Sequence, residues 1–518
     1  MKNFLYSLFL LLIPTLLYAE DGSKLWLRYQ PLSAKQVKSL SMVISSVVSE
    51  EPGDCTAITE LQDAWKQLTG KELPVVASLK DYSLVIGTEK SKLIQSLGLQ
   101  KELQTLGNDG FIIRTMKSKG NKITVIASKG ENGLLYAVFN LLRNIQLYVP
   151  SSNILRTIQL SSSPFTFDIK EVPSYKIRIL NHWDNLDGTI ERGYAGHSLW
   201  KWDELPGKLS PRYKEYARAN ASIGINGTVL NNVNASPEIL SNAYLQKVKA
   251  LAEVFRPYGI RVYLSVNFSS PTALGGLPTS DPLNESVQQW WKDKAKEIYG
   301  LIPDFGGFLV KANSEGLPGP QDFGRTHADG ANMLADALKP YNGIVMWRAF
   351  VYKSSMEDRA GQAYNEFTPL DGKFRSNVIL QVKNGPIDFQ PREPFSPLFG
   401  AMTRTALMPE FQITQEYLGA SNHLVYLAPL YKECLESDTY CSGEGSTVAW
   451  VTDGKLFPHP LTAIAGVANI GEDANWCGHQ FAQANWYAFG RLAWNNELTP
   501  EVIADEWIKQ TFNQQKDF

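Results

Sequence analysis

The stretch GFLVKANSEGLPGP, residues 307–320, changes character along its length. Residues 308–310 are apolar, as in a buried strand, and the chain then places a cation at Lys311 and a carboxylate at Glu315. Glycines and prolines follow and break the strand. An apolar strand that ends in polar, chemically active residues is typical of a parallel β-strand whose carboxyl end lines a site.

Eight candidate strands after residue 175 alternate with helical segments, of which 285–300 and 327–338 are the clearest, and six of these strands end in polar residues. Such alternation over about 300 residues predicts a (β/α)8 TIM barrel, an α/β fold. A doubly wound open sheet is the rival, but no Gly-rich phosphate loop follows the first strand. The candidate strands are 176–184, 225–234, 261–268, 307–313, 343–352, 377–385, 410–417 and 462–471.

Segments on either side of the barrel differ from it in pattern. We assign 20–150 to an N-terminal α/β domain, 151–480 to the barrel and 481–518 to the start of a helical C-terminal region. The last predicted helix, 499–512, has Thr499 as a plausible N-cap. The predicted elements of the N-terminal domain are helices at 55–70 and 132–145, a strand at 82–88 and a hairpin at 111–128.

The composition indicates a globular chain of two or three domains, with 518 residues, 44% hydrophobic and 20% charged. The net charge of −2 argues against a nucleic-acid partner and against a polybasic membrane patch. Aromatic residues make up 11% of the chain, which suits sugar-binding platforms but equally suits large cores.

The first 19 residues have the pattern of a signal peptide. A basic Lys2 precedes an apolar run at 4–17, and the small residue Ala19 stands before the expected cleavage point. The run is too short for a comfortable membrane span, and no later apolar stretch is long enough. We therefore expect an exported protein, periplasmic or extracellular, with no membrane attachment after the signal is removed.

The cysteines and histidines show no metal-binding pattern. Cys55, Cys434, Cys441 and Cys477 form no CxxC pair, and the six histidines show no HExxH spacing. The sequence thus predicts no metal and no cofactor. Export permits disulfides, so Cys434 and Cys441 either close a short loop or remain isolated thiols.

Carboxylates and cations gather at the predicted strand ends. Since the carboxyl ends of barrel strands meet at one face, these side chains are expected to share a pocket. The plainer alternative is that three acids simply neutralise three bases. The acids are Glu315, Asp388 and Glu416, and the cations are Lys311, Arg348 and Lys383.

Glycoside hydrolysis needs such a set of side chains. One protonated carboxyl gives a proton to the leaving oxygen, and one ionised carboxylate activates water or attacks the sugar. Arg and Lys bind carboxylates through charge-assisted hydrogen bonds, so the cations suit an anionic substrate. The residues by themselves therefore predict a hydrolase for an acidic sugar.

Five stretches resemble the α-glucuronidases of glycoside hydrolase family 67, and the resemblance extends to about residue 512. It implies an N-terminal α/β sandwich-like domain, a central (β/α)8 barrel and a helical C-terminal region. It also implies metal-free, inverting, exo-acting hydrolysis of the α-1,2 bond between glucuronic acid, or its 4-O-methyl ether, and the terminal xylose of xylan-derived oligosaccharides. The stretches are ILNHWDNLDGTIERGYAG (179–196), ASIGINGTVLNNVNA (221–235), GFLVKANSEGLPGP (307–320), QVKNGPIDFQPREPFSPLFG (381–400) and FQITQEYLG (411–419).

The resemblance also implies catalytic roles. Glu315 matches the general acid, and Asp388 and Glu416 match the two carboxylates that activate water. Glu315 then needs a raised pKa to hold its proton near neutral pH. For an inverting reaction, Asp388 and Glu416 should stand about 6.5–9.5 Å from Glu315.

Further matches concern substrate binding. Lys311, Arg348 and Lys383 match residues that bind the uronate carboxylate. Trp183 matches a sugar-pocket aromatic, and Val233 lies where the 4-O-methyl group is accommodated, although ordinary packing would explain both. Lys311 is then expected to face one end of the sugar while Glu315 faces the other.

Members of the family continue beyond the length of this chain, with C-terminal helices that help to cover the site and form a dimer. We therefore expect a truncated C-terminal region, and a homodimer only insofar as that region allows it. Two alternatives remain: an aldouronic-acid-binding protein that has lost catalysis through truncation, and a different exo-glycosidase on the same barrel. The cation set argues against neutral sugars.

Overall fold

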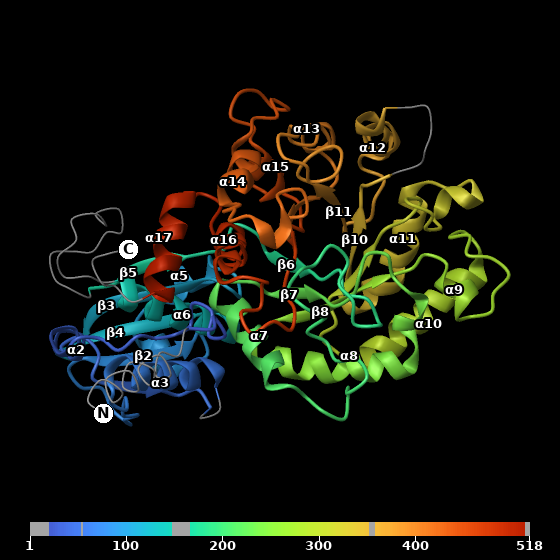
Figure 1. Ribbon diagram of the computed structural model, residues 1–518. Helices are drawn as coiled ribbons and strands as arrows, with labels where there is room; N and C mark the ends of the chain where they lie inside the picture. The colour runs from blue at the N-terminus through green and yellow to red at the C-terminus, as the bar shows by residue number, and fades with distance from the viewer. Residues whose placement is uncertain (1–19, 53–54, 148–165, 352–357, 513–518) are drawn as a thin grey trace, which may run out of the picture.

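The protein consists of an N-terminal sheet domain and a barrel that stand side by side in Figure 1. The last helices, drawn in red, return from the barrel to the N-terminal domain. The predicted signal peptide lies outside the described residues. The computed structural model describes residues 20–52, 55–147, 166–351 and 358–512.

A five-stranded mixed sheet in the order β1-β2-β4-β3-β5 forms the N-terminal domain. β1, β2 and β4 run parallel, whereas β3 runs antiparallel to both β4 and β5. The predicted hairpin is confirmed: β3 and β4 pair around Lys119 and Gly120, whose φ angles of 48° and 84° suit a two-residue turn. The strands are β1 (Ser46–Ser49), β2 (Ser83–Thr88), β3 (Phe111–Ser118), β4 (Asn121–Ser128) and β5 (Asp168–Glu171).

This sheet extends beyond residue 150, where the sequence analysis ends the domain. β5 pairs with β3, and the ion pair between Arg114 and Asp168, with a Nε–Oδ1 distance of 2.9 Å, joins the two strands. The sequence DIKE of β5 is polar, as befits an edge strand. A strand of this kind gives no apolar signal in the sequence.

Helices cover the sheet as its sequence predicts. α3 ends at Gly70, whose φ of 68° lies in the left-handed region that closes helices, and α6 runs almost fully buried across the sheet. Both predicted helices of this domain are therefore confirmed. Its helices are α2 (Ala34–Ser41), α3 (Thr56–Thr69), α4 (Lys92–Ser96), α5 (Gln100–Gln104) and α6 (Glu131–Leu147).

Eight parallel strands close into a barrel, in which β13 pairs with β6. The predicted (β/α)8 fold is confirmed, and the closure rules out the open doubly wound sheet. The strands are β6 (Ile177–Asn181), β7 (Gly227–Val229), β8 (Arg261–Val266), β9 (Gly307–Val310), β10 (Ile344–Arg348), β11 (Val378–Lys383), β12 (Leu407–Gln412) and β13 (Ala463–Val467).

The seventh barrel strand lies earlier in the chain than predicted. β12 spans Leu407–Gln412, whereas the sequence analysis placed a strand at 410–417. Pro409 pairs in register with Val382 inside the sheet, although proline supplies no N–H donor to a strand ladder. The prediction for this strand was therefore wrong at both ends, and Glu416 lies in the loop after β12 rather than at the strand's end.

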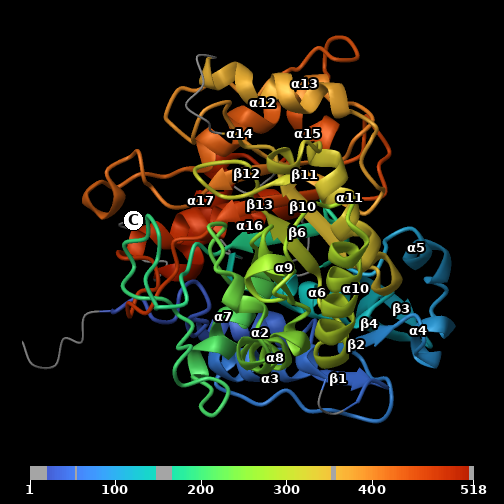
Figure 2. The same ribbon diagram turned by 90° about the vertical axis from the view of Figure 1, so that its right-hand side faces the viewer.

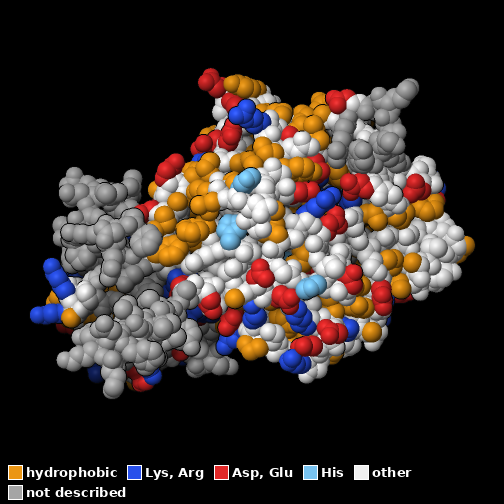
Figure 3. All heavy atoms as spheres, viewed as in Figure 1, with side chains coloured by type: hydrophobic (Ala, Val, Ile, Leu, Met, Phe, Trp, Pro, Cys, Tyr) orange, Lys and Arg blue, Asp and Glu red, His pale blue; other side chains and the backbone are white. Residues whose placement is uncertain are grey.

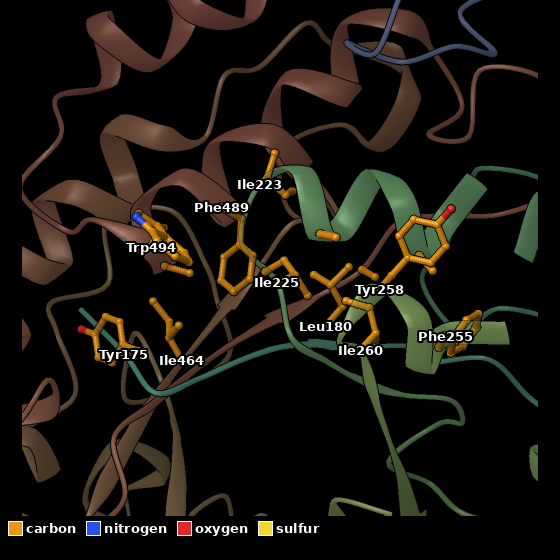
Figure 4. Packing of buried hydrophobic residues seen from close by; sticks show 14 of the residues in the cluster. Tyr175, Leu180, Ile223, Ile225, Phe255, Tyr258, Ile260, Ile464, Phe489 and Trp494 are labelled. Atoms are coloured by element: carbon orange, nitrogen blue, oxygen red, sulfur yellow. The ribbon is translucent and has the colours of Figure 1, made fainter. Parts of the chain in front are cut away.

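Alternate strand residues point into the barrel and form an apolar core there, which includes Leu309 and Met346. The outer faces of the strands pack against the helices. Figure 4 shows Phe489 and Trp494 of α16 packed with residues from the strands, among them Ile464 of β13. The polar residues that follow the strands therefore stand on a rigid, fully packed support.

The barrel helices surround the strands, and in Figure 2 α14 and α15 lie above β11 and β12 while α11 lies beside β10. α17 begins at the predicted N-cap, where the side chain of Thr499 accepts the N–H of Val502, and it packs on α6. The helices are α7 (Pro211–Ser222), α8 (Asn242–Phe255), α9 (Ser270–Ala273), α10 (Glu285–Leu301), α11 (His327–Leu338), α12 (Arg359–Phe367), α13 (Leu398–Ala401), α14 (Ala428–Glu436), α15 (Val448–Thr452), α16 (Gln483–Trp494) and α17 (Pro500–Thr511).

On the face shown in Figure 3, acidic and basic side chains are interspersed over the barrel. This distribution agrees with the net charge of −2. Among the helices of the described residues, none combines the length and the apolar character that a membrane span requires.

Candidate active site

Three cationic side chains converge on the ring of Phe350, beyond the carboxyl end of β10. The ring centroid lies 5.9 Å from Lys311 Nζ, 5.7 Å from Arg348 Cζ and 3.6 Å from Lys383 Nζ. All three cations are buried. Buried charges are costly unless they are paired, so their carboxylate partners define the rest of the site.

Lys311 pairs with Glu315 of the same loop. Its Nζ forms an ion pair with Glu315 Oε2 and donates a hydrogen bond to Asn234 Oδ1 at 2.7 Å. A buried ammonium group needs a partner for its charge, and here Glu315 supplies it. The expectation that Lys311 and Glu315 face opposite ends of a sugar stays a prediction.

Asn234 is held in place by a second carboxylate. Glu191 Oε2 accepts hydrogen bonds from Asn234 Nδ2 at 2.9 Å and from Asn232 Nδ2 at 2.7 Å. With its amide nitrogen so engaged, Asn234 turns its oxygen toward Lys311. The sequence analysis included Asn232 and Asn234 in the candidate strand 225–234. It missed Glu191, which lies in the loop after β6.

Strained backbone shapes the loop that carries Glu315. Asn313 and Glu315 both have φ of 52°, a region that residues other than glycine adopt rarely. Only glycine fits at position 319, because a Cβ there would lie 2.0 Å from Asn313 Oδ1. The same oxygen of Asn313 accepts the N–H of Gln321 at 3.1 Å. Such strain persists where the surroundings over-determine a conformation, and it is common at functional sites.

The ion pair with Lys311 sets the protonation of Glu315. Partial burial raises the pKa of Glu315, but the hydrogen bond and charge of Lys311, together with the charges of Lys383 and Arg348, outweigh that effect and lower the pKa. The expected upward shift is therefore contradicted. The lowered pKa favours the ionised form of Glu315 in this arrangement.

Arg348 pairs with an acid that the sequence analysis missed. Its Nη2 and Nε donate to Glu410 Oε2 at 2.8 and 3.2 Å, with the two side chains 2% and 0% exposed. The alternation of side-chain direction along β12 could have revealed Glu410. Met408 faces the barrel interior, so Glu410, two residues further along the strand, faces it as well.

Lys383, the last residue of β11, forms an ion pair with Asp388 Oδ1. Burial, reinforced by the charge of Arg348, lowers the pKa of Lys383 to about 8, although the charges of Asp388 and Glu410 oppose the shift. Tyr417 Oη donates to the second oxygen of Asp388 at 2.6 Å. Both oxygens of Asp388 therefore have donors.

Glu416 has a separate set of partners. Its Oε2 accepts from Gln412 Nε2 at 2.7 Å, and its Oε1 lies 3.0 Å from Arg192 Nε. Its neighbour Tyr417 is the residue that bonds to Asp388, so the loops that carry the two carboxylates are joined. The sequence analysis missed Arg192 and Tyr417, although both stand inside motifs that it quoted.

Trp183 and Val233 belong to the buried apolar cluster that also contains Phe389. The ring centroids of Trp183 and Phe389 are 6.4 Å apart, and Arg348 Cζ lies 5.9 Å from the centroid of Trp183. The fold thus brings both residues next to the cations. Because ordinary packing would place them there too, their roles toward a substrate stay predictions.

The described residues contain no group of three His, Cys, Asp or Glu side chains that could hold a metal ion. Cys434 and Cys441 are free thiols, as are Cys55 and Cys477. Of the two possibilities left open for Cys434 and Cys441, the structure shows isolated thiols.

Solved structures with low sequence identity share this fold. A family GH115 4-O-methyl-α-glucuronidase with specificity for decorated arabinogalactans aligns with a TM-score of 0.54 at 14% identity, over 90% of this chain and 59% of its own. A GH138 enzyme targeting pectin rhamnogalacturonan II aligns with a TM-score of 0.52 at 15% identity, over 90% of this chain and 52% of its own. These similarities concern the fold alone.

Curated relatives are more similar in sequence. Alpha-glucuronidase A of Emericella nidulans is 41% identical over 96% of this chain and 59% of its own length. The alpha-glucuronidase of Hypocrea jecorina is 40% identical over 99% of this chain and 61% of its own. This chain therefore spans about three fifths of the length of these relatives.

Models of three consecutive domains match the chain in order. The glycosyl hydrolase family 67 N-terminal model matches 25–141, the middle-domain model 157–476 and the C-terminal model 477–518. The middle-domain match covers all eight barrel strands and every candidate catalytic residue. The chain belongs to glycosyl hydrolase family 67.

Proposed function

We propose that this protein is an inverting exo-α-glucuronidase that removes glucuronic acid, or its 4-O-methyl ether, from the terminal xylose of xylan-derived oligosaccharides by hydrolysing the α-1,2 bond. The carrying observation is the convergence of three buried cations on Phe350, each paired with a carboxylate. Family membership and the names of the relatives support the reaction.

The uronate carboxylate would bind by exchange. Lys311 and Lys383 are each paired with one carboxylate, and the incoming anion would compete with Glu315 and Asp388 for them. A neutral sugar cannot compete in this way, because it offers no charge to replace the one that it displaces. The site therefore favours acidic sugars.

Exchange would also prepare the acid. When Lys311 turns to the substrate, Glu315 loses the hydrogen bond that lowers its pKa while its burial remains. A protonated Glu315 could then donate to the leaving xylose oxygen. The anionic group of the substrate would thus switch on the proton donor beside it.

Asp388 and Glu416 would hold the attacking water. Each carboxylate oxygen of Asp388 has a donor, and Glu416 is oriented by Arg192 and Gln412. These partners restrict the conformations of both side chains. Ordered carboxylates of this kind can position and deprotonate one water on the face opposite the leaving group. Direct displacement by that water inverts the anomeric carbon.

Proton NMR of aldotriouronic acid hydrolysis tests the proposal. We expect β-glucuronic acid as the first product from the α-linked substrate, with the α-anomer arising later by mutarotation. Initial release of the α-anomer would mean retention and would contradict the roles given to Asp388 and Glu416. Binding without release of glucuronic acid would favour the alternative of a catalytically weak aldouronic-acid-binding protein.

Export is part of the proposal. The pattern of the first 19 residues supports secretion to the periplasm or the medium, where xylan fragments are found. Fractionation of the producing cell, with N-terminal sequencing of the mature protein, tests it. We expect a mature chain that begins at Glu20, whereas a cytoplasmic chain that retains Met1 would contradict export.

A further inference from the structure

A carboxylate outside the proposed catalytic set organises the loop that carries Asp388. Glu393 Oε1 accepts the backbone N–H groups of Asp388 at 2.9 Å and Gln390 at 2.8 Å, and its Oε2 accepts that of Ile387 at 2.7 Å. Three backbone N–H groups of one turn therefore point at one half-buried side chain. Backbone N–H groups that converge in this way form an anion-binding site. Here the anion is the carboxylate of Glu393, a residue of the same loop.

The enclosed segment has a strained backbone. Phe389 has φ of 57°, in the left-handed region that bulky residues rarely adopt. The residues on either side of it, Asp388 and Gln390, both donate to the same oxygen of Glu393. Such strain persists only where the surroundings fix the conformation. The carboxylate of Glu393 thus binds the backbone on both sides of this strained residue.

The strained conformation has consequences for the site. It directs Asp388 toward Lys383 and Tyr417, and it places the Phe389 ring with its centroid 4.7 Å from Lys383 Nζ. The Phe389 ring also packs near Trp183. One turn therefore carries both a proposed water-activating carboxylate and an aromatic ring that contacts Lys383.

Gly385 provides the space that Glu393 occupies. A Cβ at this position would lie 2.3 Å from Glu393 Oε2, closer than any real contact. The backbone of Gly385 has no positive φ, so its need for glycine comes from this close approach and not from conformation. An alanine here would push the Glu393 carboxylate out of the turn.

We infer that Glu393 is a positioning residue that fixes Asp388 for the attack of water, an inference that rests on the proposed function. Glu393 touches no reacting atom and acts only through the backbone of the turn. Glu393→Gln keeps the size of the side chain and one acceptor oxygen, but its amide group turns N–H toward the N–H of Ile387. The turn should loosen, and Asp388 should lose its alignment.

The expected effect lies in turnover more than in binding. We expect Glu393→Gln to lower kcat by about 10- to 100-fold with KM changed by less than about threefold, because a displacement on the order of 1 Å costs up to about 100-fold in rate. Gly385→Ala should reproduce this pattern, since it displaces the same carboxylate. A loss that falls mainly on KM in both variants would overturn the inference.

Asp371→Asn is the matched control. Asp371 accepts the backbone N–H of Arg404 at 3.2 Å and the hydroxyl of Thr405 at 2.8 Å, before the first residues of β11 and β12. It therefore fixes backbone at the opposite end of the barrel from Glu393, in the segments that lead into β11 and β12. We expect a comparable change in unfolding temperature for Asp371→Asn and Glu393→Gln, with kcat reduced only in the latter. Equal kcat in both variants would overturn the inference.

A double-mutant cycle separates positioning from a merely structural role. If Glu393 acts through Asp388, Glu393→Gln should cause less than about a twofold further loss of kcat in an Asp388→Asn background. Losses that multiply would show that Glu393 acts independently of Asp388 and would overturn the inference. Wild-type inactivity would instead contradict the proposed function.

A crystal structure of Glu393→Gln tests the inference whatever the activity. We expect Phe389 to leave the positive-φ region and the hydrogen bond between Tyr417 and Asp388 to be broken. If Phe389 and Asp388 keep their conformations and Tyr417 still donates to Asp388, Glu393 does not position the turn and the inference is wrong.

Discussion

Lys311 and Glu315, four residues apart on one loop, form an ion pair at the carboxyl end of β9. The Lys311 side chain is 2% exposed, whereas that of Glu315 is 43% exposed, so the pair joins the buried floor of the site to its accessible side. Any anion that binds Lys311 must compete with Glu315. The protonation of the proposed acid is therefore coupled to the charge of the substrate.

This coupling predicts different pH profiles for free and bound enzyme. In the proposed mechanism, activity needs protonated Glu315 and is lost as pH rises through its pKa. That pKa is lowered while Lys311 is paired with it and should rise when the substrate takes Lys311. We expect the basic limb of kcat, measured on an aldouronic acid, to lie at higher pH than that of kcat/KM. Coincident limbs would show that Lys311 does not change partners.

Removal of the acid should matter most for poor leaving groups. We expect Glu315→Gln to lower kcat on aldotriouronic acid by about 10²–10⁴-fold, because xylose leaves poorly without a proton. On α-glucuronosyl fluoride, whose fluoride needs less assistance, the loss should be at least tenfold smaller. Equal losses on the two substrates would contradict the role of Glu315.

Asp322→Asn serves as the control for this experiment. Asp322 Oδ2 accepts the N–H of Gly319 in the same loop, at 2.9 Å, and asparagine retains an acceptor oxygen. We expect its kcat to stay within about threefold of wild type on both substrates. A loss as large as that of Glu315→Gln would mean that loop order, and not proton donation, is being measured.

Uronate binding should weaken above about pH 8. Lys383 has a pKa of about 8 because burial disfavours its charged form, so it loses its proton as pH rises through that value. The neutral amine then attracts no carboxylate. Calorimetric titration with glucuronic acid between pH 6 and 9.5 measures the effect.

Lys383→Arg supplies the comparison, because a guanidinium stays charged over that whole range. Its affinity for glucuronic acid should not fall above pH 8 in the way that the wild-type affinity does. If both proteins lose affinity in parallel, the titrating group is not Lys383.

Breaking the pair between Arg348 and Glu410 should destabilise the barrel. Arg348→Met leaves Glu410 as a buried charge with its main partner removed, which typically costs about 3–5 kcal/mol. The double variant Arg348→Met/Glu410→Met removes both charges and should recover most of that loss in denaturant unfolding. It should still bind glucuronic acid poorly. No recovery in the double variant would show that packing, and not charge, was disturbed.

Much of the fold is visible in the sequence because each barrel strand is a short apolar run followed by polar residues. β9 and α11 lie where the residue pattern predicts them. β12 does not, because Pro409 interrupts the sequence signal without interrupting the strand. β5 was missed since a charged edge strand has no apolar face to reveal it.

The sequence could predict which cations gather in the candidate site, but not which carboxylate each of them pairs with. Converging strand ends were enough to group Lys311, Arg348 and Lys383, since a barrel brings those ends to one face. Which carboxylate each cation takes depends on distances across the barrel. Glu410 was missed because the predicted strand began at residue 410 and left out Met408, which faces the barrel interior as Glu410 does. Glu393 was missed because its partners are backbone groups, which leave no trace in residue type.

The sequence by itself determined the strand and helix pattern, the closed barrel and the presence of an acid and cation set, because periodicity and residue type act locally along the chain. Only the tertiary structure decided that Lys311 holds Glu315, that Arg348 holds Glu410 and that Lys383 titrates near pH 8. Those properties depend on burial and on the distances between charges. They arise when segments far apart in the sequence meet at the end of the barrel.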